Sequence, residues 1–553
     1  MYQDEYRRIV QRLQSITGRE DVELTDGGAH ADLASTIAFT LAKEQRRQPV
    51  QIAREIAEQL QAQEEGDSVT IEVVGPYLNF HFSASYLEAT LREALQPDYG
   101  SQPLRDERVV VEHTSANPNG PLHVGHIRNS ILGDTLARSF RKAGYRLETQ
   151  YYVNDIGRQI AIVVWGVGNL GEIKKEEKGD AFIARVYIAA NRAIETDPGI
   201  TSHIDRLMQR VEQGDPQVVR QFREAVTECL EGIKATLLSL HVRHDRFIWE
   251  SDFVRNGDVT RTIDRIRRMP QCRDDGTLWV DLSSQGFEKQ YILKRSDGTT
   301  VYAARDIAFH VWKGRNFDRM IDVLGADHKL IGAQLIATLK LMGEKAPEIL
   351  HFEFVSLPEG SMSTRAGKFV SADELVEEVV KQAYVEVTTR RPELEEDVRR
   401  AIARSVAVGA IRYDIVKVSP EKSTVFDWKE ALDFERQSGP YIQYAHARAC
   451  SILEKSGEFT PAFQLSDPHE IALAKYIGRF PAIIDQVVEE LRPHLLATYT
   501  RDLADLFNAF YRYVPVLKSE GIVRQSRLAL VCAARNTLRG ALETLGIDAL
   551  ATM

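Results

Sequence analysis

Two histidines on either side of a glycine offer the most distinctive chemistry in this chain of 553 residues. His123 and His126 enclose Gly125 in the stretch from Arg108 to Asp134, RVVVEHTSANPNGPLHVGHIRNSILGD. An apolar run, a polar turn and a helical apolar period follow one another there, which predicts a strand–loop–helix unit of an α/β sheet, with the helix opening near His126. The unpaired N–H groups at a helix start favour an anion, and a glycine lets a base or ribose approach the backbone. The pattern therefore predicts a phosphate-binding corner.

The alternative for these two histidines is a purely structural pair. His241 and His244 have the same spacing but lack the preceding strand and the glycine, and we assign that pair a structural role. A metal site at His123 and His126 is disfavoured, because neither a carboxylate nor a third imidazole follows at ligand spacing.

Composition describes an ordinary globular protein that is too long for one core, with 43% hydrophobic and 27% charged residues. The net charge of −10 means that a nucleic-acid partner would need local basic faces. The four cysteines form no Cys-x-x-Cys pair, which argues against zinc and for a reducing compartment. We see no signal peptide and no uncharged run of about 20 residues that could cross a bilayer, so we expect a cytoplasmic location.

The order of the apolar patterns predicts an α/β fold class with three domains. Residues 1–104 read as a small α+β module of amphipathic helices followed by two alternating strands, VTIEVVG and YLNFHFS. Residues 105–370 read as a Rossmann-like parallel-sheet domain with a helical insertion at about 166–281, after which the sheet is expected to resume at TLWVDL. Residues 371–553 show amphipathic helices and no convincing strand, which is typical of an all-α helical bundle.

The roles of the two outer domains stay open at this point. The N-terminal module suits either packing or accessory RNA binding. In the C-terminal domain, aromatic and basic residues alternate around Tyr444 and Arg448 and again from Phe510 to Tyr513. Stacking combined with positive charge suits single-stranded RNA, and packing into the core is the alternative for most of these aromatics.

Seven motifs in this order resemble the arginyl-tRNA synthetases. HTSANPNGPLHVGHIRNSILGD resembles the His-Ile-Gly-His signature of class I aminoacyl-tRNA synthetases, and SMSTRAGK (Ser361 to Lys368) resembles their Lys-Met-Ser-Lys-Ser signature. YYVNDIGRQI, VYAARDIA, LGADHKL, GPYIQYAHAR and a terminal TLRGALETLGI complete the series. The resemblance covers essentially the whole chain, including the N-terminal module that this family adds.

This resemblance implies a two-step arginine–tRNA ligase. In the first step, the arginine carboxylate attacks the α-phosphate of ATP, giving arginyl-adenylate and pyrophosphate. In the second step, the arginyl group passes to the 2′-hydroxyl of the terminal adenosine of tRNA. The expected ligands are ATP with Mg²⁺, arginine and its tRNA, without protein-bound zinc or a membrane partner, and the family resemblance favours a monomer.

The same resemblance assigns the ATP site. His123 and His126 would contact the phosphates beside Gly125, and the loop SMSTRAGK would close over the pyrophosphate through Met362, Ser363, Thr364, Arg365 and Lys368. Ser361 and Thr364 stand where the family signature usually has lysines, so Arg365 or Lys368 would supply the missing charge. Without the upstream motif, the bland interpretation of this loop is a solvated turn before a helix.

Motif alignment also assigns the arginine pocket. Its candidate residues are Glu112, Asn117, Tyr302, Asp306 and His328. A guanidinium is a planar cation with five N–H donors and prefers carboxylates, so we expect Asp306 to pair with it and Tyr302 to pack beside it. The other three would hold the α-amino and carboxylate end or the side-chain stem. The alternative for Glu112 and Asp306 is a helix cap or a surface ion pair.

Two other functions compete with this interpretation. A small-molecule nucleotidyl-transfer enzyme shares the His-x-Gly-His signature but does not need the two outer domains. A catalytically silent paralogue could bind RNA without ligation, although both histidines and Asp306 are present. On side-chain chemistry alone, Arg448, Tyr513 and Arg535 are the candidate tRNA contacts in the helical domain.

Overall fold

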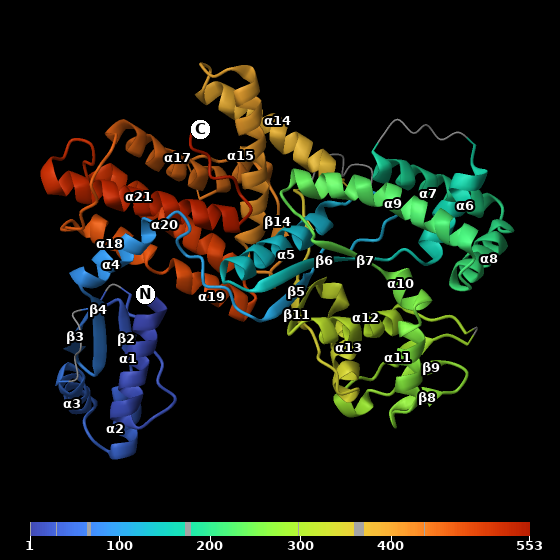
Figure 1. The fold of residues 1–553 in the computed structure, drawn as a ribbon, viewed down its shortest axis with the longest axis horizontal. Helices are drawn as coiled ribbons and strands as arrows, with labels where there is room; N and C mark the ends of the chain where they lie inside the picture. Colours follow the sequence, from blue (N-terminus) through green and yellow to red (C-terminus); the bar gives the residue numbers. More distant parts are fainter. Residues whose placement is uncertain are drawn as a thin grey trace.

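The computed structural model describes residues 2–28, 30–62, 68–171, 178–296, 298–358, 370–435 and 437–553 (Figure 1). A five-stranded parallel sheet lies near the centre, in the order β12-β11-β5-β6-β7. Its strands are β5 (Arg108–Glu112), β6 (Arg146–Val153), β7 (Arg246–Trp249), β11 (Arg319–Gly325) and β12 (Glu348–Phe352). The valines of β5 are fully buried because its neighbours flank it and helices cover the sheet. Helix α5 (Val124–Lys142) follows β5, which confirms the predicted strand–loop–helix unit.

The stretch expected as a helical insertion, 166–281, contains a strand of the central sheet. Helices α6 (Arg158–Asn169), α7 (Gly179–Thr196), α8 (Ile200–Glu212) and α9 (Pro216–Ser239) precede strand β7, which pairs in parallel with β6. The continuous helical stretch thus ends at Ser239. The prediction was wrong about the remainder because β7 has only four residues and follows polar side chains, so it shows no apolar period of its own.

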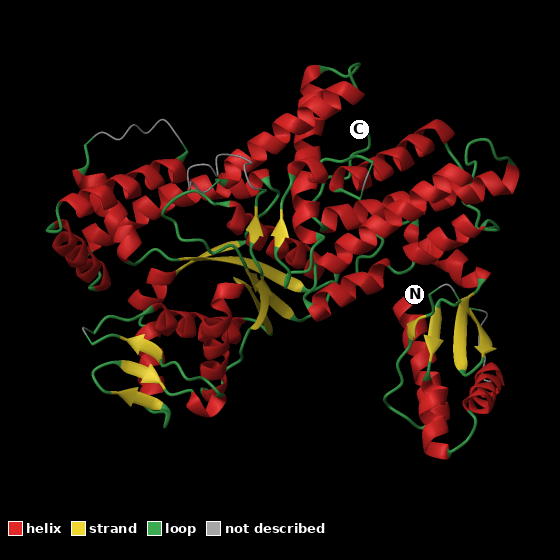
Figure 2. Cartoon of the chain, turned by 180° about the vertical axis from the view of Figure 1, so that it is seen from behind, coloured by secondary structure: helices red, strands yellow, loops and turns green. Residues whose placement is uncertain are grey.

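The expected return of the sheet at TLWVDL is also wrong. β8 (Cys272–Asp274), β9 (Leu278–Val280) and β10 (Tyr291–Lys294) form a separate antiparallel sheet, in the order β10-β9-β8 (Figure 2). A short turn joins β8 to β9, and such a turn can only make antiparallel neighbours, whereas a parallel neighbour needs a long crossover. Around this sheet lie α10 (Glu250–Arg255), α11 (Asp258–Arg267), η1 (Ser283–Gln285), α12 (Tyr302–Asn316) and α13 (Lys329–Leu341), while η2 (Ala326–His328) joins β11 to α13.

The N-terminal module is α+β, as predicted, and lies at one end of the molecule (Figure 1). Its helices are α1 (Tyr2–Thr17), α2 (Ile37–Gln45), α3 (Pro49–Ala62) and α4 (Ala84–Ala94). An antiparallel sheet in the order β1-β2-β4-β3 packs with them, from β1 (Thr25–Asp26), β2 (Leu33–Ser35), β3 (Val69–Val74) and β4 (Tyr77–Phe82). The predicted hairpin turns at Gly75, whose φ of +59° is easy only for glycine.

The C-terminal part is helical with one small exception. Its helices are α14 (Ala372–Arg390), α15 (Glu396–Val416), α16 (Trp428–Ala431), α17 (Gly439–Ser456), α18 (Pro468–Ile477), α19 (Phe480–Glu490), α20 (His494–Tyr513) and α21 (Gly521–Thr544). The expectation of no strand after residue 371 is wrong, because β14 (Thr424–Val425) pairs in parallel with β13 (Val355–Ser356). A strand of two residues is too short to show an alternation of apolar and polar side chains in the sequence. The domain boundaries at 104/105 and 370/371 stay predictions.

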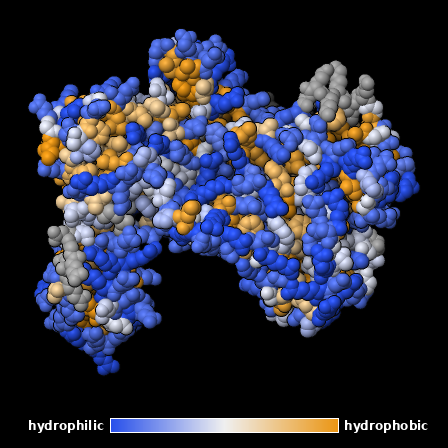
Figure 3. Space-filling model, in the orientation of Figure 1, coloured by the Kyte–Doolittle hydropathy of each residue, from blue (hydrophilic) through white to orange (hydrophobic). Residues whose placement is uncertain are grey.

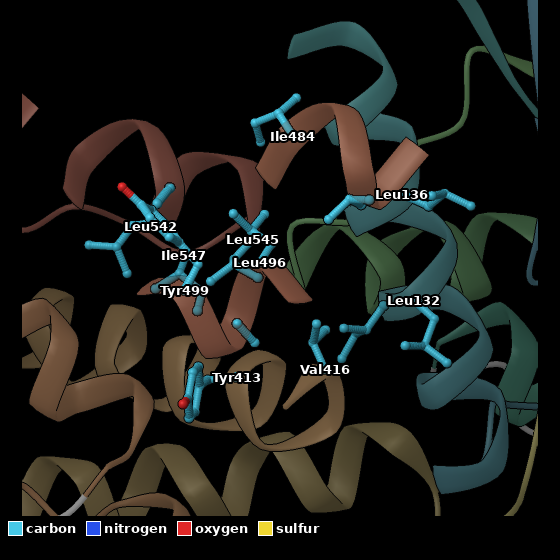
Figure 4. Packing of buried hydrophobic residues seen from close by; sticks show 14 of the residues in the cluster. Leu132, Leu136, Tyr413, Val416, Ile484, Leu496, Tyr499, Leu542, Leu545 and Ile547 are labelled. Atoms are coloured by element: carbon cyan, nitrogen blue, oxygen red, sulfur yellow. The ribbon is translucent and has the colours of Figure 1, made fainter. Parts of the chain in front are cut away.

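One apolar core joins the central sheet to these helices. Leu132 and Leu136 of α5 pack towards Val416 of α15 and the helices beyond it (Figure 4). The face seen in Figure 3 is largely hydrophilic, with apolar side chains gathered in several patches. Across the described ranges, none of the helices combines the length and the apolar character that crossing a bilayer demands.

A buried arginine crosses this core. The Arg412 side chain is fully buried on α15 and donates to Asp134 Oδ2 of α5 at 2.6 Å, Leu545 O at 2.6 Å and Leu240 O at 2.7 Å. Burial raises the pKa of Asp134, but Arg412 and Arg138 outweigh it and hold that pKa below its usual value. Three segments that are far apart in sequence therefore share one guanidinium.

We predict that Arg412→Met destabilises the protein by about 3–5 kcal/mol, because it leaves the Asp134 carboxylate buried without its main partner. Urea unfolding followed by circular dichroism measures this. The exposed pair of Arg146 and Asp106, 3.0 Å apart, gives the control: Arg146→Met should cost no more than about 1 kcal/mol. Adding Asp134→Leu to Arg412→Met should recover most of the loss; a double variant as unstable as the single one would refute the charge-based explanation.

Candidate active site

The start of α5 holds the two histidines in fixed hydrogen bonds. His123 is the N-cap, and its Nδ1 accepts from the Gly125 N–H at 3.1 Å. His126 Nδ1 accepts from the His123 N–H at 3.3 Å, and the two rings stack with their centroids 3.7 Å apart. Because both Nδ1 atoms accept, the proton of each neutral ring is on Nε2.

Burial keeps both rings neutral. It lowers the pKa of His126 to about 3, with the neighbouring His123 adding to the shift, and it also lowers the pKa of His123. At neutral pH the rings are therefore hydrogen-bond donors without charge. The positive field at this point comes from the N–H groups and the dipole of α5.

Besides letting a base or ribose approach the backbone, glycine is required at position 125 for a steric reason. A Cβ at this position would lie 2.9 Å from His123 Cε1, so any side chain would push the imidazole out of its place. The glycine therefore lets the His123 ring lie across the first turn of α5.

The loop between β5 and α5 begins with two strained residues. Thr114 and Ser115 have φ values of +70° and +37°, which L-residues other than glycine seldom adopt. Asn129 of α5 compensates by accepting from the Thr114 N–H at 2.7 Å, while its Nδ2 donates to Val323 O of β11 at 3.0 Å. Asn129 was not among the residues predicted from the sequence, although it is a polar residue within an apolar helix face.

A chain of buried charges lies at the carboxyl edge of the sheet. Lys313 Nζ of α12 donates to Glu112 Oε2 at 2.5 Å and to Asp322 Oδ1 at 2.7 Å. His310 continues the chain from Asp322 to Asp306, with its ring nitrogens 2.7 Å from Asp322 Oδ2 and 3.0 Å from Asp306 Oδ1. The structure thus brings Glu112 and Asp306 together through three residues that the sequence analysis missed. Asp306, His310 and Lys313 lie at i, i+4 and i+7, a one-face spacing that could have indicated the link.

This cluster is not a metal site. Glu112, His310 and Asp322 have ligand atoms within 4.8 Å of one another, close enough for a metal ion. The Lys313 ammonium lies among them, however, within hydrogen-bonding distance of both carboxylates. A cation of the protein itself fills the position that a divalent ion would need.

Tyr302 and Asn117 meet at the rim of the same region. The Asn154 amide lies 2.9 Å from the Tyr302 hydroxyl and 3.1 Å from Asn117 Oδ1. The side chains of Asn117 and Tyr302 are exposed, and Tyr302 opens α12 one turn before Asp306. Asn154, from the end of β6, is a further residue that the sequence analysis missed.

His328 is the candidate that the structure sets apart. It ends η2, is exposed, and its Nδ1 lies 3.1 Å from Asp327 Oδ1. Within the described residues it has no hydrogen bond to the other four arginine candidates.

Six residues of the signature loop, Ser361, Met362, Ser363, Thr364, Arg365 and Lys368, lie outside the described residues. The chain that follows them is described, and it returns to the histidines. Ala372 N donates to Leu122 O at 2.7 Å, and Ser371 forms a β-bridge with His123. On the other side, the Arg128 guanidinium of α5 donates to Glu353 O at 2.7 Å, ahead of β13.

The helical part contains an aromatic and basic cavity of about 850 Å³. Arg448 lies in its wall between two exposed tyrosines, 4.7 Å from the ring centroid of Tyr444 and 4.6 Å from that of Tyr511. The other two tRNA candidates lie elsewhere: Tyr513 packs against His469, and Arg535 donates to Asn536 Oδ1 at 2.8 Å. The structure therefore groups Arg448 with Tyr444 and Tyr511 rather than with Tyr513 and Arg535.

His241 and His244 have separate partners. His241 Nδ1 lies 3.1 Å from Gly546 O, while His244 Nε2 lies 3.1 Å from His113 Nδ1, with the two rings packed together. This arrangement agrees with the structural role expected for them.

Three family models match the chain in sequence order. The arginyl tRNA synthetase N-terminal domain matches residues 6–82, the catalytic domain of class I tRNA synthetases (R) matches residues 90–428, and the DALR anticodon-binding domain matches residues 442–553.

Known proteins agree with these models over the full length. The chain is 63% identical to an arginine–tRNA ligase of Methanoregula boonei and 62% identical to one of Methanosphaerula palustris, with 100% of each chain covered in both cases. The structure of Thermus thermophilus arginyl-tRNA synthetase, 33% identical, superposes with a TM-score of 0.87 over 99% of this chain and 100% of that one. The chain therefore belongs to the arginyl-tRNA synthetase family, class I enzymes that join arginine to tRNA at the expense of ATP.

Proposed function

We propose that ATP binds with its phosphates at the start of α5 and that His123 and His126 donate from Nε2 to phosphate oxygens during adenylate formation. The observation that carries this proposal is the fixed pair of neutral imidazoles at a helix N-terminus, on the carboxyl edge of a parallel sheet. The arginine carboxylate forms a bond to the α-phosphorus, and the bond to the pyrophosphate oxygen breaks. Positioning and charge stabilisation suffice for this step, so it needs no covalent nucleophile.

The signature loop is proposed to close over the leaving pyrophosphate through Met362, Ser363, Thr364, Arg365 and Lys368. Its support is the anchoring of Ser371 and Ala372 beside His123. Mg²⁺ would arrive with the polyphosphate, as this ion usually does, because Lys313 already fills the acidic cluster described above.

Arginine is proposed to bind between Tyr302 and the buried charges, with its guanidinium on Asp306. The cluster has three carboxylates and two cations, so it carries one uncompensated negative charge when all five groups are ionised. A cationic side chain neutralises that charge. Glu112, Asn117 and His328 would contact the α-amino and carboxylate end of arginine or the stem of its side chain.

The second step is proposed to deliver the arginyl group to the 2′-hydroxyl of the terminal adenosine. We propose that the cavity around Arg448 receives an unstacked base of the tRNA anticodon loop, since exposed aromatic rings beside a guanidinium suit single-stranded RNA. A cytoplasmic location is supported by the four free cysteines.

ATP–pyrophosphate exchange, with arginine and tRNA present, tests the role of the histidines. His126→Asn retains an acceptor where Nδ1 caps the helix but loses the Nε2 donor, so we expect exchange to fall about 10²–10³-fold. His126→Gln, which can place a donor near Nε2, should retain more activity. tRNA binding should be unchanged in both, as in the exposed control His203→Ala. Near-normal exchange in His126→Asn would remove the residue from the chemistry.

Asp306→Asn tests the arginine site. Loss of a charge-assisted hydrogen bond worth about 1.5–3 kcal/mol should raise the KM for arginine by roughly 10- to 150-fold and leave the KM for ATP nearly unchanged. Steady-state aminoacylation measures both constants. An unchanged KM for arginine would exclude Asp306 from the pocket.

Arg448→Ala should raise the KM for tRNA about tenfold by removing the cation between two stacking rings, and Arg448→Lys should restore little because lysine lacks the planar group. Arg535→Ala is the matched control and should have a small effect. The same aminoacylation assay gives the result. A larger effect at Arg535 would reverse our choice between the two arginines.

A further inference from the structure

His310 is a buried imidazole whose two nitrogens both face acceptors. Its Nε2 lies 2.7 Å from Asp322 Oδ2 on β11, and its Nδ1 lies 2.9 Å from Asp306 O and 3.0 Å from Asp306 Oδ1 on its own helix. Only a doubly protonated ring can donate from both nitrogens at once. The two carboxylate contacts favour an imidazolium in the interior, and the Lys313 ammonium also lies 3.3 Å from Nε2.

We propose that His310 is a positioning residue for arginine recognition: its imidazolium holds Asp306 by Oδ1, so that Oδ2 faces the guanidinium of the substrate. This inference rests on the proposed function, in which Asp306 pairs with arginine. It adds a specific cause for the direction in which that carboxylate points.

The charges around His310 support this role. Burial and Lys313 on the same helix both disfavour the imidazolium, whereas Asp322 and Asp306 favour it. Glu112 of β5 faces the same group through Lys313. The net result is a pKa of His310 raised to about 10, so the ring keeps both protons across the physiological range.

Asp306 is the most exposed member of the cluster, ahead of Glu112, whose side chain is 12% exposed. Its side chain is 34% exposed, whereas those of His310, Lys313 and Asp322 are at most 4% exposed. Within the described residues, Asp306 Oδ2 has no hydrogen-bond partner, while Oδ1 is held by His310. His310 thus holds Oδ1 of Asp306, and Oδ2 is left for a ligand.

The buried surroundings also favour a defined site. The hydroxyl groups of Tyr152 and Tyr291 are buried and have no partner within the described residues. Burial, together with the charge of Asp306, raises the pKa of both phenols, which therefore stay neutral.

Two substitutions at His310 separate its contact with Asp322 from its contact with Asp306. His310→Gln can reach Asp322 from the Nε2 position but loses the contact with Asp306. His310→Asn places a donor where Nδ1 contacts Asp306 but cannot reach Asp322. The proposal predicts that His310→Gln raises the KM for arginine about tenfold, with the KM for ATP and the kcat at saturating arginine changed less than about twofold. His310→Asn should have the smaller effect on arginine.

Steady-state aminoacylation by the full chain, at fixed saturating tRNA, measures these constants, and the exposed control is His203→Gln. A purely structural role would raise both KM values, or lower kcat, in both variants alike. That outcome would overturn the proposal, and so would a larger effect of His310→Asn on the KM for arginine.

A double-mutant cycle separates this inference from the proposed function. If His310 acts through Asp306, the double variant Asp306→Asn, His310→Gln should bind arginine no worse than Asp306→Asn alone. Additive effects would refute the inference and leave Asp306 in the pocket. An unchanged KM in Asp306→Asn would refute the proposed arginine site itself.

The pH dependence of stability gives an independent check. The pKa of His310 is raised from its ordinary 6.5 to about 10 in the folded state, so its stabilising contribution is complete below pH 6.5 and is lost as the pH rises towards 10. The unfolding midpoint in urea should therefore fall between pH 7 and pH 9.5 in the wild type and fall less in His310→Gln. Equal slopes would show that the ring is not the imidazolium that the proposal needs.

Discussion

The pairing of buried polar side chains along α5 is the constraint on which the active site depends. Arg128 is fully buried and its guanidinium donates to four backbone carbonyls, those of Glu353, Phe354, Ser419 and Lys422. Further along the helix, Asp134 meets Arg412. Unpaired, such groups would cost several kcal/mol each, so the helix has one low-energy position. That position sets where His123 and His126 lie.

The same helix connects the two halves of the catalytic region. Asn129 holds both the strained turn after β5 and the end of β11, which carries Asp322. The proposed phosphate-binding corner and the acidic cluster are therefore held by one rigid helix. This agrees with an adenylation step that depends on the relative placement of two substrates rather than on a reactive side chain.

Sequence reasoning worked where the periodic signal was long. The valine run of β5 and the helix after it were predictable, and so was the amphipathic N-terminal module. It failed for β7 and β14, which are too short to show a period, and for the β8–β10 sheet, whose partner strands are set by a tight turn.

At the site, the motifs indicated Asp306 but not the imidazolium behind it. His310 and Asp322 meet only when α12 packs on β11, and no local pattern reports a contact of that kind. For the same reason, Tyr513 and Arg535 were plausible by chemistry but lie apart from Arg448.

In the RNA contact that we propose, the position of Arg448 limits how a base can enter the cavity. The guanidinium already lies within 4.7 Å of the ring centroids of Tyr444 and Tyr511, and it also donates to Asn508 Oδ1. The guanidinium thus occupies the space between the two tyrosine rings. A base would therefore have to stack on the outer face of one of the tyrosine rings. It would then extend a stack of aromatic rings and a guanidinium that is already formed in the protein.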